Sequence, residues 1–297
     1  MITTSLFTLL PLLPLVSAHG WLNSITIESP TSTSSRTYTG NIPNASPTDS
    51  PIRQINNVDP VKGTTNEFLS CGQGAEVASQ VVEVNAGDSI GFAWVNGDAG
   101  PWVHNAGPMQ TYMSLCGDNQ TCSSFNAASA SWFKIQEQGR ITAGGDWFMS
   151  LMNTGAPANV TIPLNIKPGN YIIRHELIAL QIAQVEGGAE FYPACVQVSV
   201  IGDGEGAPME DELVSLPGAY SDTDPGILVD VYSNPDADYV FPGPAVAAFV
   251  SENSTASTAA NTTSTSSTAP SSCKKRRSVD TIHPRTLSRV MKSLLSQ

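Results

Sequence analysis

The residues that suggest a metal centre are histidines, of which the chain has four: His19, His104, His175 and His283, the last in the C-terminal tail and not a candidate. His19 directly follows an apolar run ending in VSA, a small-residue motif typical of signal-peptide cleavage. Cleavage after Ala18 would give His19 a free α-amino group beside its imidazole, and these two nitrogens can chelate one metal ion. A third nitrogen from His104 would complete a set of neutral donors that favours Cu(II). The sequence therefore predicts a copper site that forms only after processing.

The apolar run before His19 is interpreted as a leader. The first 18 residues, MITTSLFTLLPLLPLVSA, carry no charged side chain and are mostly apolar from Leu6 to Val16. This run is shorter than the ~20 apolar residues of a membrane-spanning helix and is typical of a secretory signal. We therefore expect removal of residues 1–18 and a secreted, extracellular protein without a membrane partner. A hydrophobic N-terminal strand is the alternative.

The chain is strongly acidic before its last 25 residues. Residues 1–272 contain seven basic and 25 acidic side chains, a formal charge of −18. Nucleic-acid backbones are bound largely through Lys and Arg, so we expect no nucleic-acid partner. A neutral or cationic partner fits this charge.

Five cysteines in an exported chain favour disulfides. Cys116 and Cys122 are close enough to close one loop, which would leave Cys71 with Cys195 as a long-range bridge and Cys273 as the odd residue. Zinc is a poor alternative because no Cys-x-x-Cys pair occurs. Five N-glycosylation sequons are compatible with export, and they begin at Asn44, Asn119, Asn159, Asn253 and Asn261.

Strand patterns dominate residues 80–202. Apolar residues alternate in VVEVN and SIGFAWVN around a Gly-Asp turn, in NVTIPLNI before a Pro-Gly-Asn turn, and in CVQVSVI. Period-2 runs separated by such turns are typical of an antiparallel sandwich or barrel. Residues 28–66 are expected to form surface loops, and helix is expected only locally, near residues 126–132. The predicted fold class is therefore all-β.

The composition of the C-terminal part predicts three segments. We expect a catalytic domain over residues 19–248, a Ser/Thr-rich linker over 249–272 and a basic tail over 273–297. The linker cannot bury a core and is typical of a flexible, O-glycosylated segment. The KKRR run from Lys274 fits proteolytic processing, and a solvated tail fits at least as well. The tail is assigned no function.

Several motifs in a fixed order resemble one known family. They are HGW from His19, HNAGPMQTYMSLC from His104, RHELIALQIA from Arg174, GGAEFYPACVQVSVIGDG from Gly187 and PGAYSDTDPGILVDVY from Pro217. Together they cover roughly residues 19–245 and resemble fungal lytic polysaccharide monooxygenases of auxiliary activity family 9, formerly glycoside hydrolase family 61. The resemblance implies an immunoglobulin- or fibronectin-III-like antiparallel β-sandwich with long surface loops and one copper ion in a histidine brace.

The resemblance also implies roles for single residues. His19 and His104 would be the copper ligands, Tyr192 the axial oxygen, and His175 a hydrogen-bond partner of the oxygen co-substrate. Both disulfides fit the family pattern. Glu190 stands where the family usually has glutamine, and an ionised glutamate accepts hydrogen bonds but cannot donate them. We expect this change to make activity more pH-dependent, unless the carboxylate points away or pairs with a cation.

The implied reaction is oxidative cleavage of a β-1,4-glucan such as cellulose at C1, C4 or both. It requires copper, an external electron donor (a small reductant or cellobiose dehydrogenase), and hydrogen peroxide or dioxygen. Trp21 and Tyr220 are candidates for stacking on sugar rings, whereas Tyr232 is expected to pack inside. We expect the protein to be a monomer.

Two other functions stay open at this point. A non-catalytic extracellular copper-binding protein would share the brace, and release of oxidised oligosaccharides from cellulose with ascorbate would exclude it. An iron oxygenase would use His104, His175 and a nearby carboxylate. Because that site needs no free His19, an intact N-terminus would favour it.

Overall fold

The computed structural model describes residues 19–117 and 121–251. The predicted leader, the basic tail with Cys273 and His283, and nearly all of the predicted linker lie outside these residues. Three of the sequons lie outside them as well, at Asn119, Asn253 and Asn261. None of the helices in the described part is both long enough and apolar enough to cross a membrane.

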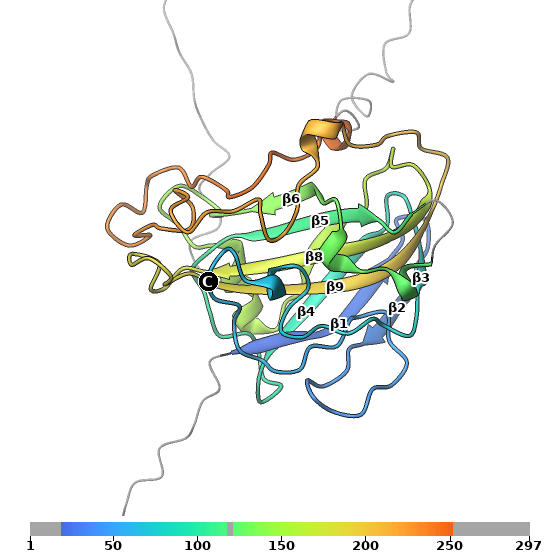
Figure 1. Ribbon diagram of the computed structural model, residues 1–297, viewed down its shortest axis with the longest axis horizontal. Coiled ribbons are helices and arrows are strands. Elements are labelled where there is room, and N and C mark those ends of the chain that lie inside the picture. Colours follow the sequence, from blue (N-terminus) through green and yellow to red (C-terminus); the bar gives the residue numbers. More distant parts are fainter. Residues whose placement is uncertain (1–18, 118–120, 252–297) are drawn as a thin grey trace, which may run out of the picture. The chain divides into compact units, whose positions relative to one another are not determined.

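The described residues contain nine strands in two sheets (Figure 1). The first sheet has the order β2-β1-β4-β7, with β1 Gly20–Glu28, β2 Ser35–Thr39, β4 Ser89–Asn96 and β7 Ala158–Thr161. The second has the order β3-β9-β8-β5-β6, with β3 Val82–Asn85, β5 Met109–Leu115, β6 Phe133–Gln138, β8 Gly169–Ala179 and β9 Glu190–Ile201. Buried side chains of both sheets form one hydrophobic core. The predicted β-sandwich with long surface loops is confirmed.

Helical structure in the described residues is short. Five segments are 3₁₀-helices: η1 Glu67–Leu69, η2 Cys122–Ser124, η3 Ala127–Ser129, η4 Phe148–Thr154 and η5 Glu210–Glu212. Residues 248–251 form a further helical turn. The helix expected near residues 126–132 is therefore only the single turn η3.

Three details of the sheets differ from the sequence pattern. The two runs around the turn at Gly87 do not pair with each other, because β3 joins the second sheet, parallel to β9, while β4 joins the first. The alternating run from Asn159 ends as a strand at Thr161, and Leu164 is 63% exposed. Phe249 packs its ring on Phe133, 5.8 Å away, so the folded domain continues past the predicted boundary at residue 248.

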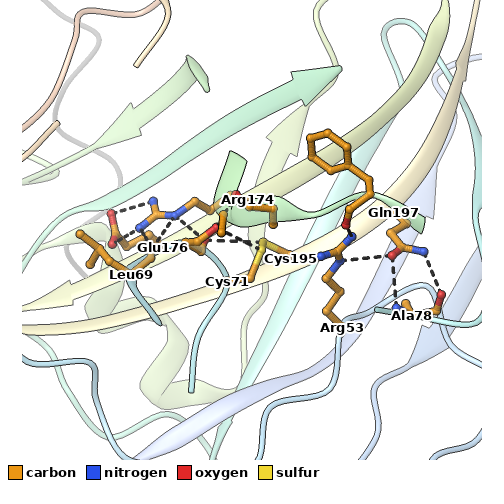
Figure 2. Close-up of a disulfide and its surroundings, with 12 residues drawn as sticks. Arg53, Leu69, Cys71, Ala78, Arg174, Glu176, Cys195 and Gln197 are labelled. Carbon is orange, nitrogen blue, oxygen red and sulfur yellow. Dashed lines mark hydrogen bonds and ion pairs between the residues drawn. A yellow bond between two sulfur atoms is a disulfide. The ribbon is translucent and has the colours of Figure 1, made fainter. Parts of the chain in front are cut away.

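The centre of the second sheet holds a buried ion pair (Figure 2). β8 is buried over its last nine residues, yet it contains Arg174 and Glu176. Arg174 donates from Nη1 to Glu176 Oε2 at 3.0 Å and from Nε to the Ser70 carbonyl at 2.9 Å. Tyr220 donates its hydroxyl to Glu176 Oε2 at 2.8 Å. Both charged groups therefore have partners within the protein.

The two disulfides are those expected from the cysteine spacing. Cys71–Cys195 ties the segment after η1 to the middle of β9, and Cys116–Cys122 closes the loop after β5. Arg53 lies beside the first bridge, where it donates to Gln197 Oε1 at 3.2 Å (Figure 2). The long loop before η1 is thereby fixed to the second sheet at several points.

His175 is a core residue of β8. Its side chain is 1% exposed, its ring stacks on Phe92 with centroids 4.5 Å apart, and its Nδ1 accepts the indole N–H of Trp94 at 3.2 Å. Burial first, and the charge of Arg174 second, lower the pKa of His175 to about 3. The predicted role of His175 beside an oxygen co-substrate is therefore wrong, because the imidazole is enclosed between the sheets and its Nδ1 already has a donor.

Replacing Glu176 with glutamine should destabilise the fold strongly. Glu176→Gln keeps the shape of the side chain but leaves the Arg174 guanidinium as an uncompensated buried charge, which typically costs ~3–5 kcal/mol. We expect a loss of that size in the free energy of unfolding, measured by denaturant titration. Glu83→Gln on the exposed side of β3 is the matched control. A loss below about 1 kcal/mol for Glu176→Gln would contradict this account.

The buried neutral imidazole predicts an acid-sensitive fold. The pKa of His175 is about 3 in the folded state and ordinarily 6.5, so the unfolded chain takes up this proton first as the pH falls. His175 therefore stabilises the fold above pH 6.5 and loses up to about 5 kcal/mol of that contribution by pH 3. His175→Gln keeps an acceptor for Trp94 and cannot titrate. The difference in unfolding free energy between wild type and variant, measured without metal, should shrink across this range. A constant difference would contradict the assignment.

Candidate metal centre

His19 lies directly before β1, where the first sheet fixes its backbone. The amide of Gly97, just after β4, donates to the His19 carbonyl at 2.7 Å. Gly20 has no room for a side chain, because an added Cβ would meet the Val95 carbonyl oxygen and lie 2.8 Å from the Trp102 ring. The glycine after the histidine thus allows β1 to reach Trp102. The His19 imidazole points its Nδ1 toward Asp59 Oδ1 at 3.1 Å.

His104 lies in the segment between β4 and β5. Asn153 of η4 holds this segment by donating to the carbonyl of Trp102 at 2.6 Å and to that of His104 at 3.4 Å. The Nε2 atom of His104 lies 3.2 Å from the hydroxyl oxygen of Tyr192. Trp102 packs edge-on against both rings, at centroid distances of 5.3 Å to His104 and 4.9 Å to Tyr192. A nitrogen and an oxygen donor therefore converge from distant parts of the chain.

Tyr192 and Glu190 open β9 and, two residues apart, point to the same face of the sheet. The Tyr192 hydroxyl donates to Glu190 Oε2 at 3.1 Å. Burial raises the pKa of Tyr192, and the charges of Glu190 and then Asp59 raise it further. The phenol is therefore neutral at physiological pH. Gly20, the neighbour of His19, lies against the Trp102 ring, and that ring packs on His104 and Tyr192, so the start of β1 approaches these two residues.

Glu190 faces the site and also pairs with a cation. Its Oε2 accepts from Gln181 Nε2 at 2.8 Å and lies 3.5 Å from His104 Nε2, while Lys62 Nζ lies 3.2 Å from its Oε1. Burial alone would raise the pKa of this carboxyl, but Gln181 and Lys62 foremost hold that pKa below its ordinary value. Glu190 is therefore an ionised acceptor. The carboxylate therefore contacts Tyr192 and His104 and also pairs with a cation, which was one of the alternatives considered for it; the expected pH-dependence of activity stays a prediction.

Three residues at this centre were missed by sequence reasoning: Asp59, Lys62 and Gln181. Asp59 and Lys62 belong to the stretch around residues 28–66, which lacks alternation and was expected to be surface loop. Gln181 follows the end of β8 by two residues. A signal existed for Gln181, because it follows the buried run LIAL within one of the motifs that carry the family resemblance.

The predicted sugar-stacking aromatics are not at the surface. Trp21 is 5% exposed, and Tyr220 is 6% exposed with its hydroxyl bonded to Glu176. Neither ring can stack on a polymer, so both predictions are wrong. Tyr232, expected to pack inside, is instead 60% exposed.

The donor atoms suit a copper brace after cleavage. Within residues 19–117 and 121–251 there is no cluster of three or more His, Cys, Asp or Glu side chains that could hold a metal ion. A brace does not need one, because it uses two imidazoles and an amine, with a tyrosine oxygen beside them. The contact of His104 Nε2 with the neutral Tyr192 hydroxyl supplies one such nitrogen and the oxygen. The alternative iron site does not fit, because His175 is enclosed in the core.

Comparison with known proteins gives a consistent result. The sequence profile of Auxiliary Activity family 9 (formerly GH61) matches residues 19–239. AA9 family lytic polysaccharide monooxygenase D of Gloeophyllum trabeum is 45% identical over 249 residues, which cover 84% of this chain and 70% of the relative. The extended catalytic domain of H. jecorina LPMO9A has a TM-score of 0.68 and 30% identity, covering 77% of this chain and 91% of that one. A cellulose-active polysaccharide monooxygenase from M. thermophila has a TM-score of 0.66 and 31% identity, covering 77% and 98%.

The matched range begins at His19 and includes His104, Gln181, Glu190 and Tyr192. The solved relatives share the fold of the described residues over three quarters of this chain. The chain therefore belongs to Auxiliary Activity family 9, the family of copper-dependent lytic polysaccharide monooxygenases.

Proposed function

We propose that this monooxygenase oxidises β-1,4-glucan chains such as cellulose at C1, C4 or both, and that His19 and His104 would hold the copper ion with the Tyr192 hydroxyl beside it. The observation that carries the proposal is the contact of His104 Nε2 with the Tyr192 hydroxyl, 3.2 Å apart. The cellulose-active relative from M. thermophila, 31% identical, supports the choice of substrate.

Processing is part of the proposal. In the full chain the nitrogen of His19 belongs to the peptide bond with Ala18, so it is a planar amide without a free electron pair for a metal. Cleavage after Ala18 turns it into an amine. Enzymes of this family are generally secreted, which agrees with the leader predicted over residues 1–18.

The protein's own residues define the site around the metal. His104 is fixed through its backbone by Asn153, and Tyr192 stays protonated because burial and Glu190 raise its pKa. When bound, copper would supply the one-electron chemistry that allows hydrogen peroxide or dioxygen to oxidise a C–H bond, with electrons supplied by an external donor. The electron donor, a small reductant or cellobiose dehydrogenase, is a partner of this proposal.

Substrate contact is assigned to an exposed surface beside the site. The Val229 amide donates to the Ala183 carbonyl at 2.9 Å, which joins the segment that carries Tyr232 to the loop after β8 that carries Gln181. Large apolar side chains are exposed on these two segments: Ile182 at 45%, Val185 at 58%, Leu228 at 37% and Tyr232 at 60%. Because an aromatic ring can stack on the apolar face of a sugar, Tyr232 replaces Trp21 and Tyr220 as the candidate.

Retention of Ala18 should abolish oxidative activity. A protein that begins at Ala18 keeps every side chain of the site but moves the amine one residue away from the imidazole of His19. We expect its Cu(II) affinity to fall by more than the ~10–100-fold that outer-shell changes cost. Oxidised oligosaccharides should appear only for protein that begins at His19, measured by mass spectrometry after incubation with cellulose, copper and ascorbate. Equal product from both forms would contradict the brace.

Tyr232 should contribute to polymer binding without affecting the metal. Tyr232→Ala removes an exposed ring and should weaken binding to cellulose roughly three- to tenfold. Tyr232→Phe keeps the ring and should bind nearly as the wild type, and copper affinity should be unchanged in both variants. Pull-down isotherms on cellulose provide the measurement. Wild-type binding by Tyr232→Ala would exclude this surface as the contact.

A further inference from the structure

Lys62 and Glu190 form an ion pair next to the predicted copper ligands. Lys62 Nζ lies 3.2 Å from Glu190 Oε1 and donates to the Gly188 carbonyl at 3.1 Å. The Lys62 side chain is 42% exposed and that of Glu190 is 10% exposed. The carboxylate is thus largely buried, whereas the ammonium group that pairs with it belongs to a partly exposed side chain.

The two oxygens of Glu190 have different partners. Oε1 faces Lys62, whereas Oε2 accepts from Tyr192 at 3.1 Å and from Gln181 at 2.8 Å and lies 3.5 Å from His104 Nε2. Lys62 therefore contacts a different carboxylate oxygen from the one that contacts Tyr192 and His104. Oε2 is left to contact Tyr192 and His104.

The charges of this arrangement have a direct consequence for a bound cation. A carboxylate this close to a ligand imidazole favours the higher positive charge, Cu(II), over Cu(I). The nearby ammonium group opposes that preference, because the pair as a whole is neutral. A glutamine at position 190 would be neutral by itself, so the Lys62–Glu190 pair carries the same net charge as the residue the family usually has.

We propose that Lys62 is the counter-ion of the copper site. By offsetting the charge of Glu190, it keeps the ratio of Cu(II) to Cu(I) affinity near the ratio that a neutral residue at position 190 would give. The proposal rests on the proposed function, since it requires copper at His19 and His104. Lys62 touches neither predicted ligand and acts through Glu190 as a positioning residue.

Four variants of the protein beginning at His19 test this role. Lys62→Met removes the ammonium group and keeps the length of the side chain, Lys62→Arg keeps the charge, and Glu190→Gln removes the carboxylate. The fourth variant combines Lys62→Met with Glu190→Gln. Lys167→Met is the matched control, because Lys167 is exposed and precedes the start of β8, at the opposite end of the strand from Gln181.

The readouts are the reduction potential of the bound copper and its Cu(II) dissociation constant, at low ionic strength. Lys62→Met should lower the potential and change the ratio of Cu(II) to Cu(I) affinity roughly two- to fivefold in favour of Cu(II). Glu190→Gln should shift the ratio in the opposite direction. The double variant should return close to the wild type, and Lys62→Arg and Lys167→Met should stay there. Added salt should reduce the Lys62→Met shift, because that side chain is partly exposed.

Two outcomes would overturn the proposal. One is a potential that Lys62→Met leaves unchanged while Glu190→Gln moves it. The other is a double variant that stays as far from the wild type as either single variant. Copper binding with no Lys62 effect would overturn this proposal alone, whereas absence of copper binding by wild-type protein beginning at His19 would overturn the proposed function as well.

Discussion

The antiparallel pairing of β8 with β9 is the constraint on which the site depends. It sets Tyr192 opposite Leu177 and Glu190 opposite Ala179, at the last pair of the ladder, so that Gln181 can reach Glu190 from beyond the end of β8. A slip of one residue would turn the tyrosine and the glutamate to the other face of the sheet. The segment after η1 links the two strands: Arg174 of β8 donates to the Ser70 carbonyl at 2.9 Å, and the next residue, Cys71, is bridged to Cys195 of β9 (Figure 2). The buried ion pair of Arg174 and Glu176 lies on β8, and Glu190 and Tyr192 of the candidate metal centre lie on the neighbouring strand β9.

The first sheet supplies the other half of the site. Pairing of Gly20 with Asn96 brings the start of β1 to the end of β4, and the chain then leads to Trp102 and His104. Trp102 touches the backbone at Gly20 and packs against the rings of His104 and Tyr192, so this indole joins the parts that the two sheets provide. This contact requires glycine at position 20, because a larger residue would collide with the Trp102 ring. Sheet pairing and one aromatic side chain therefore position groups that are far apart in the sequence.

Sequence reasoning could predict the groups that carry their own chemistry but not those that depend on register. A histidine that becomes N-terminal after cleavage can be predicted to bind a metal through its amine and imidazole. The alternation of apolar and polar residues predicts the strands and the all-β class. Tyr192 needed the family resemblance, because a tyrosine in a strand is ordinarily a packing residue. His175 was misplaced because β8 is buried on both faces, which hides the alternation that would show where its side chain points. The sequence pattern likewise did not show that Trp21 and Tyr220 are buried and that Tyr232 is exposed. Lys62 lies in a loop whose path no sequence pattern predicts.

The central claim is that one copper ion is held by the amine and imidazole of His19 and the imidazole of His104. Pulsed electron paramagnetic resonance of the Cu(II) protein beginning at His19, with histidine selectively labelled with ¹⁵N, tests it most directly because it resolves the coupled nitrogens. The account predicts three labelled nitrogens bound to copper: one amine and two imidazole nitrogens. Coupling to a single imidazole, or to three different imidazoles, would contradict it.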